Sequence, residues 1–403
     1  MSALCICVQK NVGGRAEAYR QSLQNLIQPG AVYLLAGPKY NGYMNFPYSR
    51  SDAATARKAQ LMKYIVYGSL IQKLNGLANA VISGTLGGFP SSLYGTSLTD
   101  AIHEFGLSRQ DLVILPTSEL DELASAIDAS ERLGTQAPSF HLRFIAPGLG
   151  ERDEKTRRRR LASLIAKMSS PDISLYCETE ELAAYFVRKY GLSTVGGFYL
   201  PCSIAPSANL PKSPEGAQLR IGIFGGPRAE KGSDRIGRII RATTSAEAGR
   251  SNGIDFVIQG SPDHFGPGGA YDGLVVGVQP GSNVTIVPFE DRLDPAALAE
   301  MFLSVDAVLL PYDIAVYDRN GSGVIQDAAA AGKSIIHSSG FSMSGFLSHG
   351  NAVAARTDEE FAEAALRIAA SRAAFVRGSE AARAYFQAIL RDHRLLRKLA
   401  ARP

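Results

Sequence analysis

Cysteine is scarce in this sequence, and its spacing excludes the common uses of clustered thiols. The 403 residues hold four cysteines, Cys5, Cys7, Cys177 and Cys202, with no C-x-x-C pair among them. Two of the four lie in apolar runs typical of buried strands. Neither a disulfide framework nor a zinc site is therefore expected.

Long apolar runs and a strong charge of one sign are also missing. Residues 1–8 lack a basic signal-peptide segment, and their apolar stretch is far shorter than the ~18 residues of a membrane span. Lys and Arg number 42 against 38 Asp and Glu, a formal charge of +4. This surplus is too small to mark the whole chain as a nucleic-acid binder. We expect a cytoplasmic protein that binds no nucleic acid.

Two nucleotide-binding fingerprints are absent. The chain contains neither G-x-G-x-x-G nor G-x-x-x-x-G-K-[ST]. The first motif belongs to dinucleotide-binding folds and the second to P-loop proteins. A nicotinamide oxidoreductase is therefore disfavoured.

Short apolar runs do recur, and longer helical patterns separate them, as in α/β domains with parallel sheets. We expect strands at residues 3–8, 32–36, 80–83, 111–116, 139–145, 173–178, 218–224, 255–259, 284–287, 307–310 and 334–337. We expect helices at residues 64–77, 119–133 and 180–190, and one continuous helix from 359 to about 399. The length fits two domains that each bury a core.

A proline-rich stretch, residues 196–216, divides two such α/β series and indicates a linker. We therefore expect an N-terminal domain at 1–200, a linker at 201–217 and a second domain at 218–370. Residues 371–403 would form a C-terminal helix that returns to the N-terminal domain.

The first candidate site is residues 221–240, IGIFGGPRAEKGSDRIGRII. A buried strand ends in Gly225 and Gly226, and Lys231 lies near the start of the next helix. Glycines at a strand end let a ligand approach the backbone, and a helix N-terminus beside a cation suits a phosphate. A purely structural turn remains the alternative.

The second candidate site is residues 306–336, in which a strand and a polar turn precede a helix that begins at Gly323. Ser322, Gly323 and Val324 would present consecutive N–H groups to an anion. Asp327, one turn further along, could accept two ribose hydroxyl protons. Alternatively, Ser322 is only an N-cap and Asp327 only complements the helix dipole.

These two segments together resemble the C-terminal domain of GT-B glycosyltransferases, specifically the retaining family 4. The family pattern G-R-x-x-x-E-K-G is matched by GGPRAEKG at 225–232, and its P-S … E-A-M-A-x-G-x-P-V region by 311–335. The resemblance covers about residues 218–370. It implies an α/β GT-B fold, with two facing Rossmann-like domains, parallel sheets and an interdomain cleft.

The resemblance implies a role for each matched position. Lys231 would contact the donor diphosphate, Arg228 would substitute for the family arginine whose place Gly226 takes, and Asp327 would bind the ribose. The family's first glutamate aligns with Arg319 or Asn320, so its E-x7-E pattern is altered. The further donor-binding positions are Gly13, Gly14, Gly225, Gly226, Gly321, Ser322, Gly323 and Val324. In the N-terminal domain the resemblance points to His141, with His103 behind it, as a donor-sugar contact, although a lone histidine in an apolar run is more often a core residue.

No D-x-D spacing occurs, which disfavours the metal-dependent GT-A architecture. We expect no metal and no cofactor besides the nucleotide-sugar co-substrate. Lys231, Arg228 and backbone dipoles would then stabilise the leaving diphosphate.

Residues 151–168, ERDEKTRRRRLASLIAKM, form a basic amphipathic pattern. Such helices dock on anionic membranes, and a peripheral contact with the inner face of the membrane would use Arg157, Arg158, Arg159 and Arg160. A solvated surface helix with paired arginines is the plainer interpretation.

The sequence thus predicts a retaining, metal-independent glycosyltransferase that acts on a saccharide or lipid-linked acceptor. A non-catalytic nucleotide-sugar-binding relative and a GT-B sugar-nucleotide epimerase or hydrolase stay open.

Overall fold

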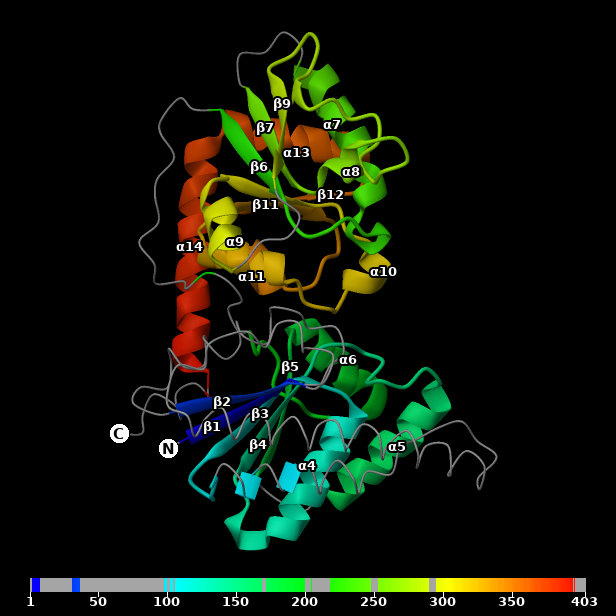
Figure 1. The fold of residues 1–403 in the computed structure, drawn as a ribbon, viewed down its shortest axis with the longest axis vertical. Coiled ribbons are helices and arrows are strands. Elements are labelled where there is room, and N and C mark those ends of the chain that lie inside the picture. Colours follow the sequence, from blue (N-terminus) through cyan, green and yellow to red (C-terminus); the bar gives the residue numbers. More distant parts are fainter. Residues whose placement is uncertain are drawn as a thin grey trace. The chain divides into compact units, whose positions relative to one another are not determined.

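The computed structural model describes residues 2–7, 31–36, 98–99, 102–103, 106–168, 172–199, 204, 218–247, 253–289, 295–393 and 395. The chain divides into two compact units, Met1–Phe198 with Lys398–Pro403 and Tyr199–Arg397, each with its own sheet (Figure 1). The division falls inside the proline-rich stretch. The roles assigned to the domains and the cleft between them stay predictions. The strand expected at 80–83 and the helix at 64–77 lie outside the described residues.

The N-terminal unit has a five-stranded parallel sheet in the order β2-β1-β3-β4-β5. Its strands are β1 (Ser2–Cys7), β2 (Ala31–Ala36), β3 (Leu112–Ser118), β4 (Ser139–Phe144) and β5 (Ile173–Cys177). Its helices include α4 (Leu120–Leu133), α5 (Glu154–Lys167) and α6 (Glu180–Tyr190), with a 3-10 turn η2 (Gly134–Gln136) after α4. Every residue of β3 is buried, as expected for a central parallel strand. The helices expected at 119–133 and 180–190 are confirmed within one residue.

The C-terminal unit has a seven-stranded sheet in the order β12-β11-β10-β6-β7-β9-β8, parallel except for β8. Its strands are β6 (Leu219–Ile223), β7 (Ile254–Gln259), β8 (Gly277–Val278), β9 (Val284–Phe289), β10 (Ala307–Leu310), β11 (Ser334–Ser338) and β12 (Ala352–Ala355). The helical elements are η3 (Ala229–Lys231), α7 (Ser233–Glu247), α8 (Pro262–Phe265), α9 (Pro295–Leu303), α10 (Ile314–Tyr317), α11 (Gly323–Ala330), α12 (Ser344–Leu347), α13 (Asp358–Ala370) and α14 (Arg372–Asp392). The α/β architecture with parallel sheets that the sequence predicts is confirmed.

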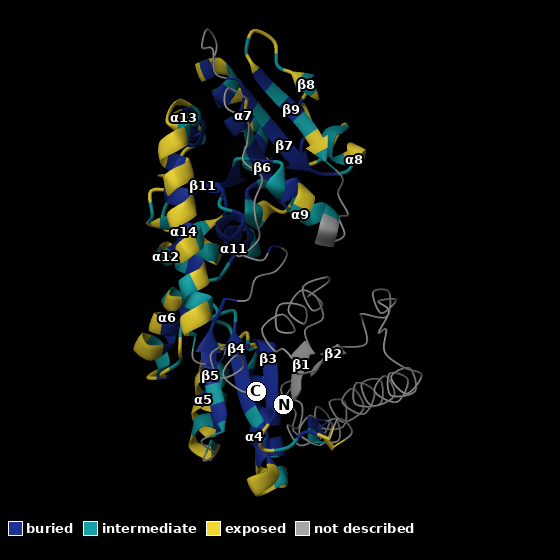
Figure 2. Cartoon of the chain, turned by 90° about the vertical axis from the view of Figure 1, so that its left-hand side faces the viewer, coloured by how far each residue is buried: buried dark blue, intermediate teal, exposed yellow. Residues whose placement is uncertain are grey.

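Each face of this second sheet carries its own apolar core, because side chains alternate along every strand. Leu309 of β10 belongs to the core that α7 and α13 cover. Its neighbours Val308 and Leu310 belong to the core that α9, α11 and α14 cover. Figure 2 shows that α14, one of these covering helices, has both buried and exposed residues along its length. α7 and α11 therefore lie on opposite faces of the sheet.

The single helix expected from 359 to about 399 is wrong. α13 ends at Ala370, and Ser371 adopts φ −124° and ψ 31°, which interrupts the helical backbone before α14 begins. The two helices pack against different elements: α13 covers one face of the sheet with α7, and α14 packs on α11 and α12. The C-terminal helix therefore starts at Arg372 as part of the second unit, and its return to the first domain stays a prediction.

Candidate functional site

The strand order of the C-terminal unit makes the carboxyl ends of β6 and β10 the expected position of a ligand. These strands are neighbours in the sheet, but β6 leads to α7 on one face and β10 leads to α11 on the other. Ligands of open α/β sheets bind at the carboxyl ends of strands where the connections diverge in this way. The two glycine-rich segments predicted from the sequence leave these two strand ends.

The loop after β6 holds a lysine over an exposed stretch of backbone. Gly225 has φ +88°, and a side chain at this position would collide with Nζ of Lys231. The Gly225 N–H donates to Oε1 of the buried Gln259 at 2.7 Å, which fixes the loop against the end of β7. Lys231 Nζ also lies 5.7 Å from the ring centre of Tyr312, which follows β10. The cation is thus placed between the two strand ends.

Backbone contacts join the same two loops. Gly232 has φ +70°, and a Cβ atom there would overlap the carbonyl oxygen of Pro311. The Asp313 N–H donates to the Glu230 carbonyl oxygen at 3.0 Å. The η3 turn is therefore packed backbone to backbone on the residues after β10, and a glycine is needed for this approach.

Arg228 precedes η3 and is half exposed, with 52% of its side chain accessible. Its guanidinium forms an ion pair with Glu230 at 3.2 Å. Gly226, the position of the family arginine, is exposed. Arg228 thus lies in the same turn as Lys231, and its contact with a donor stays a prediction.

The turn before α11 offers fewer amides than the sequence suggests. The N–H of Ser322 is directed at Sδ of Met343 at 3.2 Å, and the Ser322 carbonyl accepts from Ile325 and Gln326. Gly323 and Val324 are the first two residues of α11, where helical N–H groups have no intrahelical acceptor. Two amides of the predicted three are therefore available at this helix end.

Two polar residues of α11 are buried beneath this turn. Asp327 is 4% exposed and Gln326 is 1% exposed. The Gln326 Oε1 atom has no hydrogen-bond partner among the described residues. Arg319, one of the two residues (with Asn320) that the resemblance aligns with the family's first glutamate, is paired with Asp318, its Nε lying 2.9 Å from Oδ1. With Arg319 at its first position the pattern keeps its seven intervening residues, 320–326, but carries a positive charge in place of an acidic one.

His141 lies inside the N-terminal unit, on β4. It is 1% exposed, its Nδ1 lies 3.1 Å from the Tyr176 hydroxyl, and its Nε2 lies 3.2 Å from the Ser139 hydroxyl. This geometry favours the core role that the sequence left open, and contact with a donor sugar stays a prediction. His103 is exposed, and Gly13 and Gly14 lie outside the described residues.

The arginines of α5 divide into two kinds. Arg157 and Arg160 are tied to the protein: Arg157 donates to Glu154 and the Gly148 carbonyl, and Arg160 pairs with Glu151 at 2.6 Å and with Asp121. Arg158 and Arg159 are exposed, and Arg158 lies over the ring of Tyr190. Of the four arginines, Arg158 and Arg159 therefore remain as candidates for a membrane contact. Within the described ranges no helix has both the length and the apolar character needed to cross a bilayer.

In the part of the chain that the structure describes, few groups are suited to metal binding or to thiol chemistry. No three His, Cys, Asp or Glu side chains come together there as a ligand group. Burial raises the pKa of the free Cys177 thiol to about 12, so this thiol stays protonated at neutral pH. Metal independence stays a prediction.

Sequence reasoning did not identify Gln259, nor two residues beside the site, Ser338 at the end of β11 and Arg356 after β12. All three are polar residues at the carboxyl ends of strands. This position at strand ends could have identified them, because parallel strands bring their carboxyl ends to one edge of the sheet. The short strand β12 was not expected, so Arg356 could not be recognised as a residue that follows a strand.

No protein-family model matches this sequence, and no curated protein matches it. The fold, however, is similar to that of several solved structures. The chain is similar to the sucrose-phosphate synthase of Thermosynechococcus elongatus, with 14% identity, full coverage of both chains and a TM-score of 0.56. It is similar to the lipopolysaccharide outer core galactosyltransferase WaaB, with 11% identity, 97% and 98% coverage and a TM-score of 0.54. It also resembles HepE of Anabaena, solved in complex with UDP, with 13% identity, 96% and 95% coverage and a TM-score of 0.52. The chain therefore has the GT-B fold of glycosyltransferases, and its resemblance to family 4 in particular stays a prediction.

Proposed function

We propose that this protein is a glycosyltransferase that moves a sugar from a nucleotide-sugar donor to a saccharide or lipid-linked acceptor. The observation that carries the proposal is the position of Lys231 Nζ, beside Gly225 after β6 and 5.7 Å from the ring centre of Tyr312 after β10. A cation and the first amides of a helix, here Lys231 and the N–H groups of Gly323 and Val324, are groups that bind a diphosphate. The full-length GT-B similarity, including a structure solved with UDP, supports this reading.

The proposed chemistry is electrostatic. The acceptor oxygen forms a bond to the anomeric carbon as the bond from that carbon to the diphosphate breaks and the diphosphate keeps the electron pair. The acceptor proton passes to a leaving diphosphate oxygen, on the same face, so the anomeric configuration is retained. Lys231, with Arg228 beside it, stabilises the charge that develops on the leaving group, without a metal. Asp327 holds the ribose, and no protein nucleophile is used.

One observation favours a second candidate, a GT-B relative that binds nucleotide-sugars without transfer. Arg319 stands where the family has an acidic residue, and it is paired with Asp318 rather than open to a sugar. A sugar-nucleotide epimerase or hydrolase would share the same diphosphate site.

A panel of UDP-, GDP-, ADP- and dTDP-sugars separates these functions. We expect one nucleotide class to raise the melting temperature of the wild-type protein, because a ligand that binds only the folded state stabilises it. Transfer of labelled sugar to a saccharide or lipid-linked acceptor would establish the glycosyltransferase. Binding without turnover over a broad acceptor set would favour the second candidate, and nucleotide release or sugar conversion without acceptor would indicate a hydrolase or epimerase. No stabilisation by any member of the panel would contradict the proposal.

A further inference from the structure

A cavity of about 410 Å³ lies in the C-terminal unit beside the proposed diphosphate site. It is lined by the start of α7 and by the residues that follow β10, β11 and β12. Tyr312 belongs to both the cavity and the diphosphate site, because it lines the cavity and Lys231 Nζ lies over its ring. The volume falls in the ~300–1,000 Å³ range of small-molecule sites.

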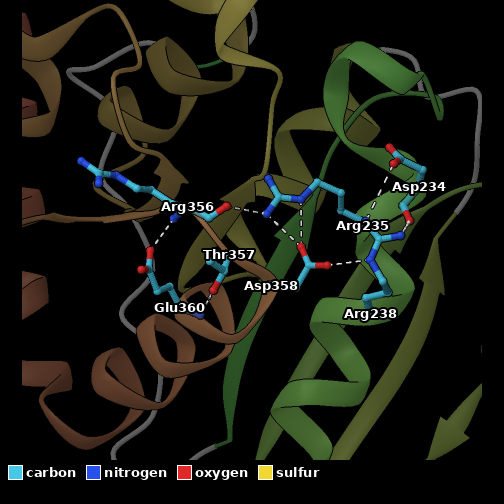
Figure 3. Close-up of polar contacts among 7 residues, drawn as sticks. All are labelled: Asp234, Arg235, Arg238, Arg356, Thr357, Asp358 and Glu360. Atoms are coloured by element: carbon cyan, nitrogen blue, oxygen red, sulfur yellow. Dashed lines mark hydrogen bonds and ion pairs between the residues drawn. The ribbon is translucent and has the colours of Figure 1, made fainter.

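Arg356 is one of the residues that line this cavity, and no described residue pairs with its guanidinium. Its backbone is fixed, because its N–H donates to Glu360 at 2.6 Å and its carbonyl accepts from Arg235 at 2.9 Å. Figure 3 shows the side chain directed away from Asp358, whose carboxylate is occupied by Arg235 and Arg238. An arginine with an anchored backbone and free donors is positioned to bind a ligand.

Ser338 lines the same cavity and gives independent evidence. The residue is 4% exposed, and its hydroxyl has no hydrogen-bond partner among the described residues. A buried hydroxyl without a partner destabilises the folded protein, so such groups are rare. A ligand that hydrogen-bonds to the hydroxyl would remove that cost.

The lining selects the kind of ligand. Arg235 and Arg356 contribute two positive charges, and Asp234 and Asp313 contribute two negative ones, so the ionisable side chains that line the cavity balance. Tyr312 and Ile314 add apolar surface. An anion would meet two carboxylates, whereas a sugar offers hydroxyl groups to both charge types and C–H groups to the apolar patch.

We propose that this cavity binds a neutral glycosyl unit, with Arg356 and Ser338 as its hydrogen-bond donors. The unit comes either from the nucleotide-sugar donor or from a saccharide acceptor. The proposal rests on the proposed function for its biological setting, but the cavity itself is argued from its lining.

Two variants and a matched control test the proposal in the full-length protein. Ser338→Ala removes only the unpartnered hydroxyl, so the melting temperature stays the same or rises. Arg356→Ala removes an unpaired exposed side chain, and Arg367→Ala removes another exposed arginine of the same segment, on α13, outside the cavity. We expect the first two variants to lower sugar affinity about tenfold, the scale of a lost polar contact, and the control to leave it unchanged.

Two arms identify the source of the sugar. Saturation-transfer NMR with free glucose, galactose, mannose and N-acetylglucosamine reports an acceptor-type site. Calorimetry with UDP-glucose against UDP, and with GDP-mannose against GDP, reports a donor-type site through the affinity ratio of each pair. A loss in either arm that is confined to the two cavity variants supports the proposal.

Unchanged affinities in both arms would overturn it. So would a loss of melting temperature in Ser338→Ala, which would show that the hydroxyl has a structural partner. Displacement of a bound sugar by inorganic phosphate would identify an anion site instead. If no nucleotide or nucleotide-sugar binds even the wild type, the proposed function fails, and the free-sugar arm decides this proposal alone.

Discussion

Buried polar side chains differ from one another in whether their hydrogen bonds are made within the protein. Arg143 of β4 is fully buried, and it donates to the carbonyls of Pro116 and Phe198 at 2.7 and 3.0 Å, with Glu178 at 3.7 Å. Gln326 and Ser338 are buried too, yet each keeps an atom without a partner in the described structure. The first kind stabilises the fold. Atoms of the second kind occur in both units, with Thr117 Oγ1 and Glu247 Oε1 among them, but Ser338 lines the cavity, where a ligand would complete its contacts.

Glu122 gives a pH-dependent prediction at this scale. Burial raises its pKa to about 7 from the ordinary value of 4.5, although the Glu119 N–H donates to it at 2.8 Å. A raised pKa means that the folded state holds the proton more tightly, so the contribution to stability is present below pH 4.5 and is lost as pH rises through about 7. Glu122→Gln should therefore reduce the fall in unfolding free energy between pH 5 and about pH 7.5, by up to about 3 kcal/mol. Urea unfolding at both pH values measures it.

Glu131→Gln, on the exposed side of α4, is the matched control and should follow the wild-type pH profile. An unchanged profile in Glu122→Gln would show that Glu122 is ionised in the folded protein throughout this range.

Elements of the C-terminal unit meet at strand ends through a few close contacts, and Gly232 is the tightest. A methyl group there meets two obstacles, the positive φ and the Pro311 carbonyl. We predict that Gly232→Ala displaces η3 and Lys231 with it, so that nucleotide binding is weakened. The unfolding free energy should fall by about 2 kcal/mol or more. Thermal unfolding and nucleotide titration measure both effects.

Gly268 provides a control of the same conformation, with φ +76° but open space around its Cα. Gly268→Ala should show only the cost of the left-handed backbone, roughly 1 kcal/mol, with normal nucleotide affinity. Equal losses in the two variants would remove the contact with Pro311 from the explanation.

Asp358 joins α7 to α13 across 120 residues of sequence. Its carboxylate accepts from Arg235 at 2.8 Å and from Arg238 at 2.6 Å, although Arg238 is half exposed. Burial alone would raise the pKa of Asp358, but the bonds from Arg238 and Arg235 outweigh it and hold the pKa below its ordinary value of 3.8. The contribution is therefore present above pH 3.8 and is lost as pH falls through the folded-state value.

We predict that Asp358→Asn lowers the unfolding free energy by about 1–2 kcal/mol at pH 7, with a smaller difference near pH 3. Denaturant unfolding at the two pH values checks this. Asp234→Asn, whose carboxylate lies 3.9 Å from Arg238 and is largely exposed, should change little. A difference for Asp358→Asn that grows towards low pH would contradict the assigned ion pairs.

At the scale of the whole molecule, the sequence predicted most of the described strands but missed short strands and the break between the last two helices. Apolar runs located β6, β7, β10 and β11 within one or two residues, because buried parallel strands are continuously apolar. The four-residue β12 was missed, since its three alanines and one valine carry little strand signal. The break at Ser371 was missed because neither glycine nor proline marks it.

The candidate site was predictable in its parts and not in its assembly. Lys231 and the α11 turn could be recognised from local glycine and capping patterns. Their junction depends on Tyr312 and Pro311, about 80 residues further along the chain, and on the strand order. Local patterns carry no information on such contacts, and for the same reason Gln259 and Ser338 were not identified.

The central claim is that the ends of β6 and β10 bind the diphosphate of a nucleotide-sugar, and titration calorimetry of Lys231→Ala tests it most directly. The titrant is the nucleoside diphosphate that the sugar-nucleotide panel selects, and Arg241→Ala, an exposed cation on α7, is the control. We predict that Lys231→Ala weakens binding by about 1.5–3 kcal/mol, the scale of a charge-assisted hydrogen bond, while Arg241→Ala binds as the wild type does. Equal affinity in wild type and Lys231→Ala would contradict the account.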